Sequence, residues 1–183
     1  MQKSLPICQL GRSAQEDLSL RGAAVPVVDI HDPLIQQLID DAIATIKAAN
    51  GVGIAAPQLG HALRLFIVAS RPNPRYPEAP TMEPTAMINP VILAKSNNMV
   101  SDWEGCLSLP DRRAQVLRHQ SIEVTYLDRY GNRYHQELTD FIARIFQHEY
   151  DHLEGIVFSD RLVDESELIT EADYLQQISV SIA

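Results

Sequence analysis

Apolar positions recur along this chain with two different periods, and each period predicts a different kind of element. Between residues 33 and 49 the apolar side chains return every three or four positions, which predicts an amphipathic helix. Asp32-Pro33 suits the start of that helix, and Asn50-Gly51 suits its end. A continuous apolar run at residues 64–69 instead predicts a strand that is buried on both faces.

Further strands are expected in the middle of the chain. Strand-like segments lie at about 86–94 and 99–105, and Ser96, Asn97 and Asn98 form the expected turn between them. Residues 120–127 alternate between apolar and polar, and we expect a hairpin with residues 133–138. Two stretches are expected to lack regular structure: residues 1–30, and the five-proline segment 71–84, which should be a long surface loop.

A second long helix is expected at residues 140–154, with Gly155 at its end. Its apolar residues lie on several sides, which indicates a central position. A short last helix should begin at residues 170–173. Helices and strands are segregated, so we predict an α+β fold with antiparallel or mixed sheets packed around the central helix. We expect one catalytic domain over residues 1–183, ending in an acidic tail from about residue 160.

Composition and charge limit the kinds of molecule that this protein is expected to bind. The 183 residues are 45% hydrophobic, and the formal net charge is −9. Such a surface repels phosphate backbones and anionic lipids, which argues against direct nucleic-acid binding and against membrane binding. No apolar run approaches the ~18 residues of a membrane span, and the first residues do not resemble a signal peptide. We therefore expect a cytoplasmic protein, with an organellar stroma or matrix as the alternative.

Candidate chemistry is concentrated in the expected central helix. His148 and His152 are four residues apart, so on a helix they share one face with Cβ atoms roughly 5–6 Å apart. Glu149 is rotated by about 100° from His148 and could reach a water on a metal that both histidines hold. This is the H-E-x-x-H pattern of metal hydrolases.

Three sources of a third ligand compete. Metzincin proteases supply a histidine at the position that Phe158 occupies here, which disfavours that class. A thermolysin-like site would use a later glutamate, and Glu171 has a suitable position but lies in an acidic tail that we expect to be solvated. Cys106 is the third candidate: a buried apolar cysteine is common, yet two histidines with one cysteine is also a known catalytic set. The residues alone leave this choice open.

Three separated motifs, at residues 51–58, 104–108 and 147–152, resemble the three signature motifs of peptide deformylase in the same order and with similar spacing. The resemblance covers roughly residues 20–165. It implies a hydrolase of protein biosynthesis that removes the formyl group from the N-terminal formylmethionine of nascent bacterial and organellar peptides, with release of formate. A zincin-type metallopeptidase is the alternative, and a non-catalytic metal-binding module is the third hypothesis.

The resemblance also implies a metal site. One divalent ion would be bound by Cys106, His148 and His152. The ion would be Fe²⁺ in the cell, with Zn²⁺ or Ni²⁺ possible after purification. Glu149 would act as general base and then return the proton to the leaving amine.

By the same resemblance, the side-chain amide of Gln58 and the backbone N–H of Leu107 would stabilise the oxygen of the formyl group during the reaction. The glycines before Gln58 would let backbone approach the substrate, and Gly51 and Gly53 could adopt positive φ. A narrow site lined by Gly53, Cys106 and Leu107 would exclude an acetyl group.

The remaining predictions concern the peptide and the supporting residues. Val52, Phe141, Ile145 and the His148 ring edge would form a methionine pocket, and Arg113 would lie near the peptide entrance. Glu104 and Gln147 resemble residues that orient the metal ligands, and Asp151 would serve His148 or pair with Arg144. N-formylmethionyl nascent peptides would be the substrates. Ribosome contact would be transient at most, because this tail is acidic where some family members carry a basic helix.

Overall fold

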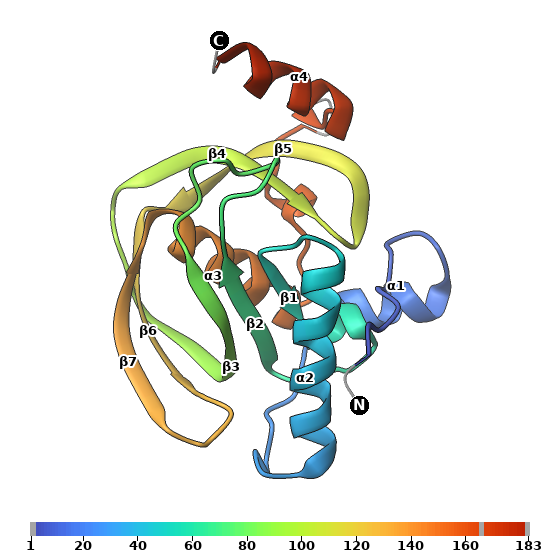
Figure 1. Ribbon diagram of the computed structural model, residues 1–183, viewed down its shortest axis with the longest axis vertical. Helices are drawn as coiled ribbons and strands as arrows, with labels where there is room; N and C mark the ends of the chain where they lie inside the picture. Colours follow the sequence, from blue (N-terminus) through green and yellow to red (C-terminus); the bar gives the residue numbers. More distant parts are fainter. Residues whose placement is uncertain (1–2, 165–166, 182–183) are drawn as a thin grey trace.

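The computed structural model describes residues 3–164 and 167–181, and it has the predicted α+β architecture (Figure 1). Five strands form one antiparallel sheet in the order β1-β2-β3-β6-β7, and two more form a separate antiparallel sheet, β4-β5. The strands are β1 Gly53–Ala55, β2 Leu65–Ser70, β3 Met82–Lys95, β4 Met99–Cys106, β5 Leu109–His119, β6 Ser121–Leu127 and β7 Arg133–Thr139. Within the described ranges, no helix has both the length and the apolar character needed to cross a membrane.

Strand β2 explains how two helices cover the two faces of the large sheet. Phe66 and Val68 belong to the cluster that contains α3 (Asp140–Leu153), whereas Leu65 and Ile67 pack with α2 (Pro33–Ala48). Successive side chains of a strand point to opposite faces, so a continuous apolar run is what a strand between two helices requires. The prediction that this strand is buried on both faces is confirmed.

Helix α3 occupies the centre of the molecule, as predicted, and packs against β1 and β2 of the large sheet (Figure 1). Phe146 on α3 is fully buried and meets the ring of Phe66 edge to face, with the centroids 5.1 Å apart. Gly155 ends the helix at φ 73°, and a Cβ there would collide with the backbone of Arg21. These contacts position α3 against the large sheet and against the end of the N-terminal helical segment at Arg21.

Most of the predicted elements are confirmed. Helix α2, strand β2 and the β6–β7 hairpin lie within one or two residues of their expected bounds. The last helix, α4 (Glu171–Ser181), begins at the predicted place, where Thr170 Oγ1 accepts a hydrogen bond from the Asp173 backbone N–H at 3.1 Å.

The prediction that residues 1–30 are irregular is wrong. They contain helix α1 (Ala14–Arg21), whose N-cap Ser13 accepts a hydrogen bond from the backbone N–H of Glu16 at 3.2 Å. Ser13 and Glu16 have the Ser-x-x-Glu spacing of a capping box. That local signal could have revealed the helix.

Strand β5 was missed. Ser96–Asn98 lie between β3 and β4, as predicted, but these two strands belong to different sheets: β3 pairs with β2 and β6, and β4 pairs with β5. The alternating buried positions of β5 are Ala114, Val116 and Arg118. A buried arginine in the alternation conceals the apolar face by which a strand is recognised.

The expected surface loop at 71–84 is shorter than predicted, because β3 begins at Met82. Its Arg75 and Tyr76 are partly buried and line a cavity. The loop therefore contributes to the interior surface near the central helix.

Candidate active site

Three potential metal ligands converge where β4 ends against α3. Cys106 Sγ and one ring nitrogen each of His148 and His152 lie within 4.8 Å of one another, and the sulfur is 3.2 Å from His152 Nε2. The two histidines come from adjacent turns of α3, as predicted, and Cys106 is the last residue of β4. One thiolate and two imidazoles suit zinc and other first-row transition ions. The donor set therefore fits the implied divalent metal.

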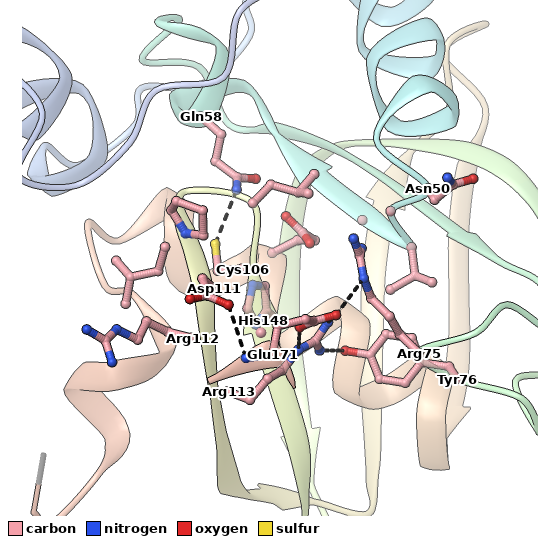
Figure 2. A pocket seen from close by; sticks show the side chains of 18 residues that line it. Asn50, Gln58, Arg75, Tyr76, Cys106, Asp111, Arg112, Arg113, His148 and Glu171 are labelled. Atoms are coloured by element: carbon pink, nitrogen blue, oxygen red, sulfur yellow. Dashed lines mark hydrogen bonds and ion pairs between the residues drawn. The ribbon is translucent and has the colours of Figure 1, made fainter. Parts of the chain in front are cut away.

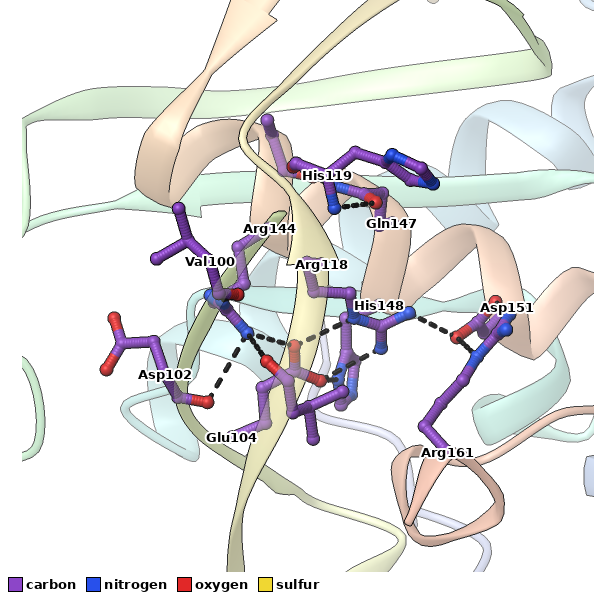
Figure 3. Close-up of polar contacts among 12 residues, drawn as sticks. Val100, Asp102, Glu104, Arg118, His119, Arg144, Gln147, His148, Asp151 and Arg161 are labelled. Atoms are coloured by element: carbon purple, nitrogen blue, oxygen red, sulfur yellow. Dashed lines mark hydrogen bonds and ion pairs between the residues drawn. The ribbon is translucent and has the colours of Figure 1, made fainter. Parts of the chain in front are cut away.

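Glu104 orients one of these ligands. Its Oε2 lies 2.9 Å from His148 Nδ1, which leaves the other ring nitrogen of His148 for a metal. Glu104 is 3% exposed and also accepts hydrogen bonds from Arg118 and Arg144 (Figure 3). Burial alone would raise the pKa of Glu104, but Arg118 and His148 hold it well below its usual value. Glu104 is thus ionised and orients the His148 ring through a hydrogen bond, as the resemblance implied.

Two other supporting predictions are wrong. Asp151 contacts neither His148 nor Arg144; it pairs with Arg118 at 2.6 Å and with Arg161 (Figure 3). Gln147 bonds to the backbone of His119 and Ala143 rather than to a metal ligand. Both side chains fasten α3 to neighbouring segments, a role that depends on the pairing of β5 and was invisible without it.

The electrostatics favour a thiolate at Cys106. Burial by itself would raise the pKa of this thiol, but the adjacent imidazoles of His152 and His148 hold it well below its usual value. Burial would likewise lower the pKa of His148, yet Cys106 and Glu104 raise it well above the usual range. A metal ligand must be a thiolate, so the surroundings of Cys106 are suited to that state.

Glu149 lies beside the ligand cluster and is 3% exposed. Burial raises the pKa of its carboxyl to about 7. A Cβ on Gly53 would come within 2.7 Å of Glu149 Cδ, so only glycine allows β1 to approach this closely. The expectation that Gly51 and Gly53 adopt positive φ is wrong, because neither is among the residues with positive φ.

Two buried polar atoms in this region have no hydrogen-bond partner among the described residues: Glu149 Oε2 and His152 Nδ1. Buried polar groups without a partner are uncommon and often mark sites where a water or ligand binds. Glu149 Oε2 is therefore available to a molecule that enters the site.

Gln58 is held in one orientation by its own turn. Its side-chain oxygen accepts a hydrogen bond from the Ala55 N–H at 2.8 Å, so its NH₂ group faces Cys106 Sγ at 3.4 Å and Ser108 Oγ at 3.1 Å (Figure 2). Leu107 follows Cys106 in the tight turn into β5. Gln58 and Leu107 thus lie next to Cys106 along two different segments.

A cavity of about 260 Å³ opens above these residues. Its wall contains Cys106, His148 and Glu149 together with the glycine-rich stretch before Gln58, and charged side chains lie at its rim (Figure 2). Sequence reasoning gave no role in the site to Asn50, Asp111 and Arg112, and it named no single residue of the 71–84 segment, which contributes Arg75 and Tyr76. No motif marked them, because they meet only when the 71–81 loop and β5 fold against β1.

A smaller apolar hollow of about 30 Å³ adjoins the cavity on the α3 side. Val52, Phe141 and Ile145 line it together with the His148 ring, as the sequence predicted. Tyr76 and Trp103 also line it, and the Tyr76 ring lies 4.9 Å from that of Phe141. The structure thus brings the three candidate pocket residues to one place.

Arg113 lines the cavity, near the expected peptide entrance, whereas Glu171 differs most from expectation. Arg113 is only 4% exposed, and its guanidinium is paired with Glu171 (Figure 2). Glu171 is therefore not a solvated tail residue, and it lies outside the cluster of three donors. Phe158, at the metzincin ligand position, is 1% exposed and packs with Cys106 in an apolar cluster. Neither protease-type third ligand is present.

Fold and site together define a metal-binding α+β protein whose candidate site combines two helical histidines, a strand cysteine and a buried glutamate with one oxygen that no described residue contacts by a hydrogen bond. The family described as polypeptide deformylase matches residues 5–167 of the chain. The chain belongs to this family, and it is therefore a hydrolase that removes formyl groups from formylated nascent peptides. The zincin alternative is not favoured.

Relatives support the assignment along nearly the whole chain. "Peptide deformylase 2" of Nostoc sp. is 59% identical over 96% of this chain and 95% of its own. "Peptide deformylase 2" of Shewanella oneidensis is 48% identical over 87% and 84%. A crystal structure of class I type b peptide deformylase from Acinetobacter baumannii with Met-Ala-Ser bound has 45% identity and a TM-score of 0.81, covering 88% of this chain and all of that one.

Proposed function

We propose that Cys106, His148 and His152 hold one divalent ion and that Glu149 is the proton-transferring residue of the deformylation reaction. The observation that carries this proposal is the convergence of the three donors within 4.8 Å beside a buried, partly unpartnered carboxylate at the cavity wall. Folding alone would not require these four groups to lie together.

A divalent ion held by these ligands supplies Lewis acidity, which makes a water nucleophilic near neutral pH. Glu149 takes a proton from the attacking water and gives it to the amine nitrogen as the C–N bond of the formyl amide breaks. The products are formate and a peptide with a free amino terminus. Gln58 Nε2 and the Leu107 N–H donate hydrogen bonds to the formyl oxygen as it gains negative charge.

The cavity and the smaller apolar hollow beside it account for the choice of substrate. Val52, Phe141 and Ile145 offer apolar surface for the methionine side chain next to His148. The close approach of Gly53 to Glu149 leaves little room at the reacting carbon, which favours a formyl group over bulkier acyl groups. Met-Ala-Ser bound to the Acinetobacter relative supports a methionine at this site.

For the ion, we propose Fe²⁺ in the cell, with Zn²⁺ or Ni²⁺ able to replace it, since a site with one thiolate and two imidazoles accepts several first-row ions. Purification without oxygen, followed by metal analysis and activity measurement on the same sample, tests this. Iron at about one ion per chain that tracks activity is the expected result, and full activity in an iron-free zinc form would contradict it.

We also propose that the enzyme acts on nascent peptides in the cytoplasm and that any ribosome contact is transient. The bacterial relatives support the location. The described tail includes acidic residues such as Asp160, Asp164 and Glu167, which would repel ribosomal RNA. Co-sedimentation with ribosomes at increasing salt tests the contact, and stable binding at high salt would contradict it.

The role of Glu149 is tested with Glu149→Gln, which preserves size and removes the ionisable carboxyl. We expect formate release from formyl-Met-Ala-Ser to fall by roughly 10²–10⁴-fold, while metal content stays at the wild-type level. Glu137→Gln, on the exposed strand β7, is the matched control and should retain full activity. Unchanged activity of Glu149→Gln would remove the proposed base, and casein cleavage by the wild type would revive the protease alternative.

A further inference from the structure

Three segments that are far apart in sequence meet at one wall of the cavity. The 71–81 loop brings Arg75 and Tyr76, strand β5 brings Arg113, and the start of α4 brings Glu171 (Figure 2). Glu171 accepts hydrogen bonds from Arg113 Nε and Nη2 and from Arg75 Nε, the last at 3.0 Å. The C-terminal segment therefore forms part of the cavity instead of trailing away from it.

Backbone contacts fix the position of Glu171. Arg113 and Ile169 exchange a pair of backbone hydrogen bonds of 2.9 and 2.8 Å, so the C-terminal segment pairs with β5 just before α4 begins. The Glu171 N–H also faces Asp111 Oδ1 at 3.3 Å. The carboxylate is thus presented to Arg113 by two tethers on the same strand.

Arg113 is held in place by two aromatic rings and by the backbone of β4. Its guanidinium carbon lies 5.4 Å from the Tyr76 ring centre and 5.1 Å from that of Tyr174, and Nη1 donates to Tyr76 Oη at 2.6 Å. A Cβ on Gly105 would lie 2.6 Å from the same carbon, so the guanidinium rests on the backbone that immediately precedes Cys106. Arg113 thus connects the C-terminal segment to the end of β4, where Cys106 lies.

Not all the donors of Arg113 are used. A guanidinium has five N–H groups, and three of them have partners here: one on Glu171 Oε2, one on Glu171 Oε1 and one on Tyr76 Oη. The other two have no acceptor among residues 3–164 and 167–181. Because Arg113 lines the cavity, these N–H groups are available to a bound molecule.

We propose that Glu171 is a positioning residue that holds Arg113 so that its unused N–H groups bind a backbone carbonyl of the peptide beyond the formylmethionine. This inference rests on the proposed function, in which the formyl group lies at Cys106 and Glu149. Arg113 rests on Gly105, so it lies next to that point on the rim of the cavity. Residues that follow the methionine would pass it on their way to solvent.

The test compares two substrates on the full, metal-loaded chain: formyl-Met-amide and formyl-Met-Ala-Ser-amide. Amides avoid a terminal carboxylate that would itself attract arginine. For Glu171→Gln we expect KM for the longer peptide to rise roughly tenfold, the effect of weakening one charge-assisted hydrogen bond, with kcat nearly unchanged. Kinetics on formyl-Met-amide should not change, because that substrate ends before Arg113.

Glu167→Gln is the matched control: it makes the same change in the same segment, but Glu167 contacts the Asp164 N–H rather than the cavity. It should behave as wild type with both substrates. Arg113→Gln should show the same selective rise in KM. If Glu171 acts through Arg113, the double variant should be no worse than Arg113→Gln alone.

Equal losses on both substrates, additive effects in the double variant, or an unchanged KM for the longer peptide would each overturn the positioning role. Failure of the proposed function is recognised separately, because the wild type would then release no formate from either substrate. A thermal melt of each variant confirms that the compared proteins are folded.

Discussion

At the scale of single residues, the site depends on contacts too close to tolerate an added methyl group. Gly53 allows β1 to lie against Glu149, and Gly105 allows Arg113 to rest on the backbone before Cys106. Neither glycine has positive φ, so the reason for glycine at both positions is space, not backbone conformation. The sequence indicated that small residues were needed here but not which side chains they would meet.

Gly53→Ala should therefore be damaging. The new Cβ would displace the Glu149 carboxyl from its place beside the ligands, and we expect formate release to fall at least tenfold, as for other small misplacements of catalytic groups. Metal content should stay close to wild type, because the ligands come from other segments. A variant with unchanged kcat would show that Glu149 can move without loss of activity.

At the scale of elements, the interface between α3 and the β4–β5 sheet contains buried ion pairs at its centre. Glu104 on β4, Arg118 on β5 and Arg144 on α3 are each at most 6% exposed, and Glu104 accepts hydrogen bonds from both arginines (Figure 3). Glu104 also contacts His148. The same carboxylate thus connects the small sheet to the helix and orients a metal ligand.

Glu104→Gln should weaken both the contact between the small sheet and α3 and the orientation of His148. An amide cannot satisfy two arginines and accept from His148 as a carboxylate does, and loss of such ligand support typically lowers metal affinity by about 10–100-fold. We expect a matching increase in the metal concentration needed for half-maximal formate release. Glu123→Gln, on β6, is a control that should leave metal affinity unchanged. Equal affinities in all three proteins would contradict the role.

At the scale of the whole molecule, the C-terminal segment is attached to the body partly by charge. Glu171 pairs with Arg113 and Arg75, and Tyr174 packs against Trp103 with the ring centroids 5.4 Å apart. Burial would raise the pKa of Glu171, but Arg113 and Arg75 lower it below the usual value. Ionised Glu171 therefore contributes to stability above the unfolded-state carboxyl pKa of about 4.3.

This contribution should be lost as the pH falls from about 4.3 through the lower pKa of folded Glu171, because protonation then removes the charge that the arginines attract. Urea unfolding of chelator-treated protein from pH 7 to pH 3 should show a smaller acid-induced loss in Glu171→Gln than in wild type. The difference should be about 1 kcal/mol or less, as for partly exposed ion pairs. Identical pH dependence would mean that Glu171 titrates alike in both states.

The sequence determined the local elements and the identity of the chemical groups. Helical periodicity and continuous apolar runs are properties of neighbouring residues along the chain, so helix α2, strand β2 and helix α3 were predictable. The capping box of α1 is a local signal too, although it was overlooked. The spacing of His148 and His152 on one helix likewise brought two ligands together without any tertiary contact.

Only the tertiary structure decided how distant segments meet. Strand β5 presents a buried arginine whose partners, Glu104 and Asp151, come from two other elements, so no local pattern could identify it as a core position. Cys106 reaches the histidines because β4 pairs with β5 beside α3. Glu171 looked like a solvated acid in an acidic tail, yet backbone pairing with β5 places it at the substrate cavity. Such outcomes depend on long-range pairing, which single-chain periodicity does not encode.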